Sequence, residues 1–74
     1  MQTLNQLKSN ETAQITSLEG DNAHIMRLCA LGFVPGAIVN VFKETLMGGP
    51  SIYSIQDSKI ALRAADANLI RVAR

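Results

Sequence analysis

The chain has 74 residues, of which 47% are hydrophobic, and its seven lysines and arginines nearly balance six aspartates and glutamates. A chain of this length forms one domain, residues 1–74, and buries only about 60% of its unfolded surface, so its hydrophobic residues must supply a compact core. The cations are interleaved with acids and form no basic stripe, which argues against non-specific nucleic-acid binding and electrostatic membrane adhesion.

The cysteine count and the N-terminal sequence predict a cytoplasmic location. The single cysteine, Cys29, cannot close an internal disulfide, and residues 1–11 lack the apolar run of a signal peptide. No stretch of the chain approaches the roughly 20 apolar residues that span a bilayer. We therefore expect no direct membrane insertion.

The N-terminal part of the chain predicts a helical turn followed by a strand. Residues 3–7 favour one turn of helix that places Leu4 and Leu7 on the same side. Residues 12–18 (TAQITSL) alternate between apolar and polar side chains at first, which is typical of a strand with one wet face.

A helix is predicted over residues 22–31. Asp21 or Asn22 is a good N-cap, because its side-chain oxygen can accept a hydrogen bond from the free amides of the first turn. One inward-facing stripe along this helix is predicted from the spacing of three apolar residues: Ile25, Leu28 and Leu31.

The segment LGFVPG, residues 31–36, predicts a sharp helix end followed by a turn. Gly32 reaches the left-handed conformation without a Cβ clash, so it suits the C′ position. Phe33 is then C″ and Leu28 is C3, the two positions whose side chains touch in a Schellman motif. Pro35 prevents any continuation of the helix.

The second half of the chain predicts four more strands. Residues 37–44 are apolar on both faces, which suits a strand covered on each side or one that bends round a small barrel. Five short strands are too few for a sandwich, so we predict a mainly β fold: a small, five-stranded barrel of the SH3 type with one inserted helix. The remaining predicted segments are a loop at 46–50, strands at 51–56, 59–63 and 69–73, and a helical turn at 64–68 before the last strand.

Several short motifs occur in a fixed order along nearly the whole chain. They are RLCALGFVPG at 27–36, Val39 and Val41, Leu46, GGP at 48–50, ALR at 61–63, Asp66-Ala67, and Ile70 and Val72. In this order and spacing they resemble the FeoA family, small cytoplasmic proteins of the bacterial ferrous-iron uptake system.

The resemblance implies an SH3-like barrel with an inserted helix, in agreement with the pattern of elements. It also implies a function: support of FeoB, a membrane ferrous-iron transporter whose cytoplasmic portion contains a GTP-hydrolysing domain. A similar domain forms the C-terminal part of some iron-dependent transcriptional repressors.

The sequence does not assemble a catalytic or metal site. His24 and Cys29 are five positions apart on the predicted helix, and about 100° per residue puts them roughly 140° apart, so they do not converge as base and nucleophile. Met26 is also a ligand by type, but a metal site needs three or four convergent groups. We therefore expect a protein that is not an enzyme and has no cofactor. The alternative function is an Fe(II)-responsive sensor that binds the metal itself.

The remaining candidates are residues that could contact a partner protein. Leu46 and Met47 are large apolar residues on a predicted surface loop, although Leu46 could instead plug one end of the barrel. Arg63 could pair with Asp66, or Asp66 could cap the helical turn. An arginine donated to the nucleotide of a partner GTPase is conceivable for Arg63 or Arg27.

The leading hypothesis is an adaptor that presents its inserted helix and the loop at 46–50 to the cytoplasmic side of a FeoB-type transporter. Self-association is a further possibility, because a short open strand edge could pair with another copy. A proline-peptide groove is not supported, because Phe33 and Tyr53 are assigned to the helix end and the core. The candidate partner contacts are Met26, Arg27, Leu46, Met47 and Arg63.

Overall fold

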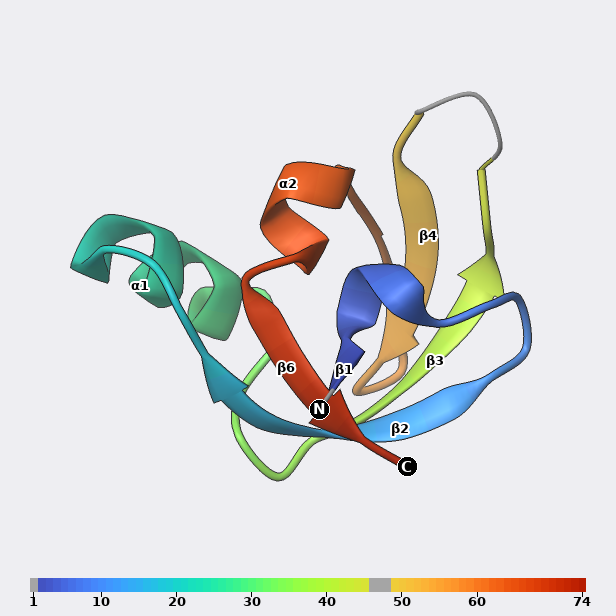
Figure 1. The fold of residues 1–74 in the computed structure, drawn as a ribbon, viewed down its shortest axis with the longest axis horizontal. Coiled ribbons are helices and arrows are strands. Elements are labelled where there is room, and N and C mark those ends of the chain that lie inside the picture. The colour runs from blue at the N-terminus through green and yellow to red at the C-terminus, as the bar shows by residue number, and fades with distance from the viewer. Residues whose placement is uncertain (1, 46–48) are drawn as a thin grey trace.

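The computed structural model describes residues 2–45 and 49–74 and is mainly β, with an inserted helix and a helical turn before the last strand, as predicted. Leu46 and Met47 lie outside the described residues. None of the described helices is long and apolar enough to cross a membrane. In chain order (Figure 1), the elements are β1 (Gln2–Thr3), the 3₁₀ helix η1 (Leu4–Gln6), β2 (Thr12–Leu18), α1 (Asn22–Ala30), β3 (Ile38–Lys43), β4 (Ser51–Ile55), β5 (Ser58–Leu62), α2 (Ala64–Ala67) and β6 (Ile70–Ala73).

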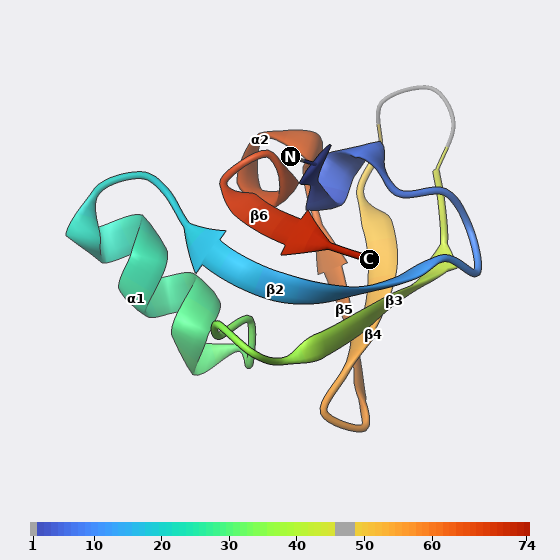
Figure 2. The same cartoon turned by 60° about the horizontal axis from the view of Figure 1, so that its bottom comes forward.

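The strands form one antiparallel sheet in the order β1-β6-β2-β3-β4-β5. The structure adds β1 to the five predicted strands. This strand has two residues, too few for an alternating pattern, and Gln2 and Thr3 pair with Val72 and Arg71 of β6. The sheet curls strongly on itself (Figure 2), but no hydrogen-bonded pairing joins β1 to β5 among the described residues. One outer edge of β5 is therefore not covered by a strand.

Two irregularities increase the curvature of the sheet. The register shifts between Ile15 and Ser17 in β2, and again between Val41 and Lys43 in β3. A β-bulge of this kind bends its strand and increases the local twist. Such bends allow a sheet of short strands to wrap around one small core.

The core lies inside the curled sheet and is made of apolar side chains from every strand except β1. Tyr53 belongs to it, as predicted, and burial raises the pKa of its hydroxyl. Leu4 and Leu7 fill one end from η1 and the residue that follows it. Apolar residues from β2, α1, β3 and β6 converge in this core: Ile15, Leu28, Val39, Val41 and Ile70.

The end of α1 has the predicted Schellman geometry. Gly32 has φ +108°, and its N–H donates to the Cys29 carbonyl at 3.0 Å. The Phe33 N–H donates to the Leu28 carbonyl at 3.0 Å, and both side chains are fully buried. At the other end of the helix, Asp21 is the N-cap.

The predicted inward stripe of α1 is only partly correct. Leu28 is buried, but Ile25 is half-buried and Leu31 is exposed. Helix α1 projects beside the curled sheet (Figures 1 and 2), so Ile25 in its N-terminal half does not reach the core. Leu31 is the C-cap residue and stays exposed although Leu28, three residues earlier, is buried. On β3, Ile38 and Phe42 are 58% and 51% exposed, so this strand bends round the core and is not covered on its outer face by described residues.

Candidate interaction surface

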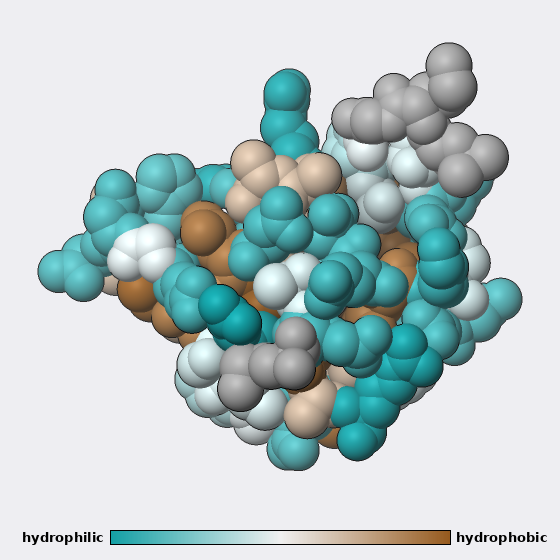
Figure 3. All heavy atoms as spheres, in the orientation of Figure 1, coloured by the Kyte–Doolittle hydropathy of each residue, from teal (hydrophilic) through white to brown (hydrophobic). Residues whose placement is uncertain are grey.

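Helix α1 turns one face to solvent. Met26 is 71% exposed, more than the other large apolar residues at the described surface. Arg27 follows it, and a shallow hollow of about 160 Å³ is lined by Ala23, His24 and Arg27. Figure 3 shows hydrophobic atoms at the surface beside hydrophilic ones in the region of α1. This face offers an apolar side chain next to a cation, a combination suited to protein contacts.

The two helices are joined by an ion pair. An Arg27 guanidinium nitrogen donates to Asp66 Oδ1 at 2.9 Å, and the Asp66 side chain is only 20% exposed. The structure therefore pairs Asp66 with Arg27 and not with Arg63, and Asp66 lies in the first turn of α2 without capping it. An exposed pair of this kind contributes about 1 kcal/mol or less, so its main effect is to orient α1 against α2.

Arg63 is the N-cap residue of α2, but its side chain makes no capping bond. It is exposed, and its carbonyl accepts from the Asp66 and Ala67 amides at 3.0 Å. Both arginines therefore lie at α2. Arg27 pairs with the α2 residue Asp66, and Arg63 is the residue at which α2 begins. Sequence reasoning placed both on a partner surface without revealing this relation.

His24 and Cys29 do not form a site together. His24 Nδ1 lies 2.8 Å from Asp21 Oδ1, and Cys29 is a half-buried free thiol. In the described part of the chain, no three His, Cys, Asp or Glu side chains are grouped so that they could hold a metal ion. Direct Fe(II) binding stays a prediction.

The N-cap of α1 makes a pH-dependent prediction. Two hydrogen bonds from His24 lower the pKa of the Asp21 carboxyl. The bond from the His24 backbone N–H has the larger effect, and the bond from its ring has the smaller one. Because the folded pKa is below the unfolded one, this stabilisation is present above the unfolded pKa and is lost as the pH falls through the folded pKa. We expect amide exchange in α1 to accelerate relative to β3 over that acidic range. In Asp21→Asn, which keeps an acceptor but does not titrate, this acid-dependent change should shrink; an unaltered pH profile would contradict the assignment.

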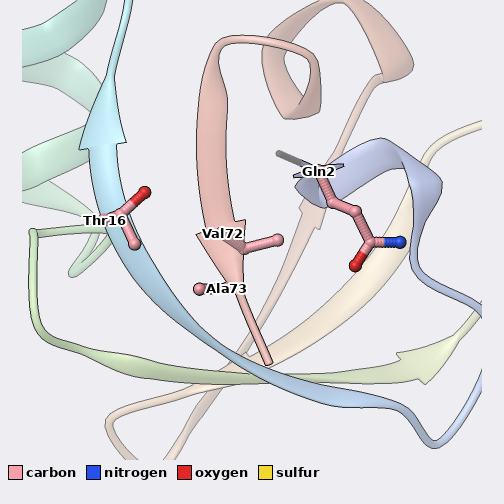
Figure 4. A pocket seen from close by; sticks show the side chains of 4 residues that line it. All are labelled: Gln2, Thr16, Val72 and Ala73. Atoms are coloured by element: carbon pink, nitrogen blue, oxygen red, sulfur yellow. The ribbon is translucent and has the colours of Figure 1, made fainter.

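A second hollow, of about 470 Å³, is lined by Gln2, Thr16, Val72 and Ala73 from β1, β2 and β6 (Figure 4). The sequence analysis did not identify it. In the sequence, Thr16 is simply a polar residue after an apolar one, as expected in an alternating strand. In the structure it falls at the β2 bulge, where its hydroxyl donates to the Arg71 carbonyl at 3.2 Å. None of the four lining side chains is acidic or basic, so the hollow offers hydrogen bonds and an apolar floor but no acid–base pair.

Both the sequence and the overall fold match known proteins. The model of the FeoA domain family matches residues 2–74. The chain belongs to the FeoA family. The expected family is thereby confirmed over almost the full chain, while no curated protein matches the chain.

Solved FeoA structures share this fold. The solution structure of FeoA from Chlorobium tepidum is 30% identical, with a TM-score of 0.86 over 96% of this chain and 68% of that one. The solution structure of iron(II) transport protein A from Clostridium thermocellum is 31% identical, with a TM-score of 0.90. The match covers 96% of this chain and 44% of that one.

A third FeoA structure describes the architecture directly. FeoA from Stenotrophomonas maltophilia, complexed with zinc, is 28% identical, with a TM-score of 0.85 over 99% of this chain and 91% of that one. It is described as a prokaryotic SH3 domain protein, so the predicted SH3-like fold is confirmed. A manganese-dependent transcriptional repressor at 15% identity shares the fold alone, with a TM-score of 0.87 over 40% of its chain.

Proposed function

We propose that this chain is a non-enzymatic accessory protein of ferrous iron uptake that binds the cytoplasmic, GTPase-containing part of a FeoB-type transporter and modulates its activity. The observation that carries the proposal is the FeoA match over residues 2–74. The S. maltophilia relative, which aligns with 99% of this chain, is described as a proposed ferrous iron transport activating factor. A location on the cytoplasmic side follows from this role.

The exposed face of α1 is the surface that we assign to the transporter. Its N-terminus is fixed by the Asp21 cap, its C-terminus by the Schellman motif, and its side by the Arg27–Asp66 pair. A helix held at three points loses little conformational freedom when a partner binds, which lowers the entropic cost of association. The thioether of Met26 is flexible and polarizable, so it adapts to an apolar recess on the partner.

Modulation requires unequal affinity for two states of the transporter, because a ligand with equal affinity for both shifts neither population. The test is a calorimetric titration of this chain into the soluble cytoplasmic domain of the transporter, with GDP, with a GTP analogue and without nucleotide. We expect binding with a Kd that differs between these states. The absence of binding in all three conditions would overturn the proposal.

The assignment of the α1 face makes a prediction about Met26. In Met26→Asp, a buried apolar contact becomes a desolvated charge, and we expect the affinity for the transporter domain to fall at least about tenfold. The matched control is Ile38→Asp, which adds the same charge at another exposed apolar position, on β3. Equal losses for both variants, or a loss only for Ile38→Asp, would place the contact elsewhere.

A further inference from the structure

The last strand of the sheet, β5, has an unpaired edge. It is joined to β4 by a two-residue turn in which Gln56 and Asp57 have φ +46° and +66°, and Ile55 pairs with Ser58. In a hairpin of this kind the closing pair is hydrogen-bonded and the pairs then alternate, so Lys59 and Ala61 point their N–H and C=O groups away from β4. Within residues 2–45 and 49–74, no backbone group bonds to this edge.

Two side chains along this edge, Lys59 and Arg63, are cations, and the one acid of the β4–β5 hairpin, Asp57, lies in its turn. Strand alternation places Lys59, Ala61 and Arg63 on the outer face of the sheet. The Lys59 ammonium confirms this for its own position, because it lies 4.8 Å from the ring centroid of the exposed Phe42, on the other side of β4.

The ion pairs among the described residues do not include these two cations. Among the described residues, three arginines are paired with carboxylates, at distances of 2.7–2.9 Å. Lys59 and Arg63 enter no such pair, and neither do Lys8 and Lys43, the latter next to Phe42 on β3. Glu44, the acid next to Lys43, is bonded to Ser9. Its carboxylate accepts from the Ser9 amide, and its own backbone N–H donates to the Ser9 hydroxyl.

We propose that the β5 edge binds an extended segment of a partner protein with two carboxylates at alternate positions on either side of an apolar residue. The segment adds as a strand: its backbone bonds to Lys59 and Ala61, its carboxylates lie opposite Lys59 and Arg63, and its apolar residue lies opposite Ala61. Backbone bonds supply affinity in this mode and alternate side chains supply specificity. This site is separate from the α1 face and does not depend on the identity of the transporter.

A second copy of the chain fits this edge less well. Antiparallel pairing of two β5 strands brings the Lys59 and Arg63 side chains of one copy close to those of the other, and lysine on an edge strand is a common device against such pairing. Charge complementarity therefore favours an acidic partner segment.

The experiment uses three synthetic peptides, blocked at both ends, and the ¹⁵N-labelled chain. The acidic probe is Thr-Glu-Thr-Val-Thr-Glu-Thr, which reads the same in both directions. The basic control has lysine for both glutamates, and the third peptide has proline for valine. We expect the acidic probe to shift the Lys59 and Ala61 amides, to slow their exchange, and to bind at least about tenfold more tightly than the basic control at low salt. Equal affinity of the acidic and basic peptides, or no binding at millimolar concentration, would overturn the proposal.

Two variants separate the backbone contribution from the charge contribution. Ala61→Pro removes the backbone N–H of residue 61, which faces away from β4. Edge strands tolerate proline at such a position, so the fold should persist while binding of the acidic probe is abolished. The double variant Lys59→Glu, Arg63→Glu should reverse the preference and bind the basic peptide, whereas Lys8→Glu, a cation outside this edge, should leave it unchanged. Failure of the double variant to reverse the preference would overturn the proposal. Concentration-dependent dimerisation that protects the edge without peptide, or binding to phosphatidylglycerol vesicles with none to the acidic probe, would do so as well.

Discussion

Replacement of Phe33 by alanine is expected to lower the free energy of unfolding by about 3–5 kcal/mol, the cost of removing a large aromatic side chain from a packed core. Phe33 is fully buried and is the largest of the fully buried side chains. It also forms the C″ position of the α1 Schellman motif, where it is tied to Leu28 by a backbone hydrogen bond. Since native proteins have only about 5–15 kcal/mol of stability, this loss is a large fraction of the total.

The chain contains a matched control for this prediction, because its only other phenylalanine is exposed. Phe42 is 51% accessible and contacts the Lys59 ammonium. Phe42→Ala should cost about 1 kcal/mol or less, the usual range for an exposed cation–π contact. Urea denaturation of the two variants measures the difference directly. Similar losses in both would mean that Phe33 is not the centre of the core.

Replacement of Leu28 by alanine is expected to cost about 2–5 kcal/mol, but to act first on α1. Leu28 is the one residue of α1 that is fully buried, and it contacts the core from the C-terminal half of the helix. A nine-residue helix is too short to persist in water without tertiary packing. Amide exchange should therefore accelerate throughout α1 by a larger factor than in β3 and β4.

Met26→Ala on the same helix serves as the control. Its side chain is 71% exposed, so truncation should change the unfolding free energy by no more than about 0.5 kcal/mol. Hydrogen–deuterium exchange followed residue by residue distinguishes the two variants. Uniform acceleration over the whole chain in Leu28→Ala would show that α1 and the sheet unfold as a single unit, against the expectation.

These predictions also separate stability from recognition. Phe33 and Leu28 hold α1 in place from inside, whereas Met26 and Arg27 face outward on the same helix. A loss of transporter binding in Leu28→Ala would follow from a disordered helix, but a loss in Met26→Asp with α1 intact would identify a contact. The β5 edge lies on other elements, so its peptide binding should survive Met26→Asp.

The features that the sequence by itself determined are those that depend on neighbouring residues. The Asp21 cap, the Gly32–Phe33 helix end and the alternation along the strands all follow from local backbone geometry, and each occurs where it was predicted. The FeoA resemblance included one of these local features, the helix end within RLCALGFVPG at 27–36. The chain's core could be predicted because a period of two residues assigns each strand an inner face.

Other features were decided only by the tertiary structure, because they join residues that no local rule relates. Asp66 pairs with Arg27 across 39 positions, although Arg63 is nearer in sequence. The partial exposure of Ile25 depends on how far α1 projects beyond the sheet, which helical periodicity does not encode. Among the described residues, Lys59 and Arg63 form no ion pair, while Glu11, Glu19 and Asp66 pair with arginines elsewhere in the fold. A pattern in the chain specifies which face of an element is apolar, but only packing in three dimensions decides what, if anything, covers that face.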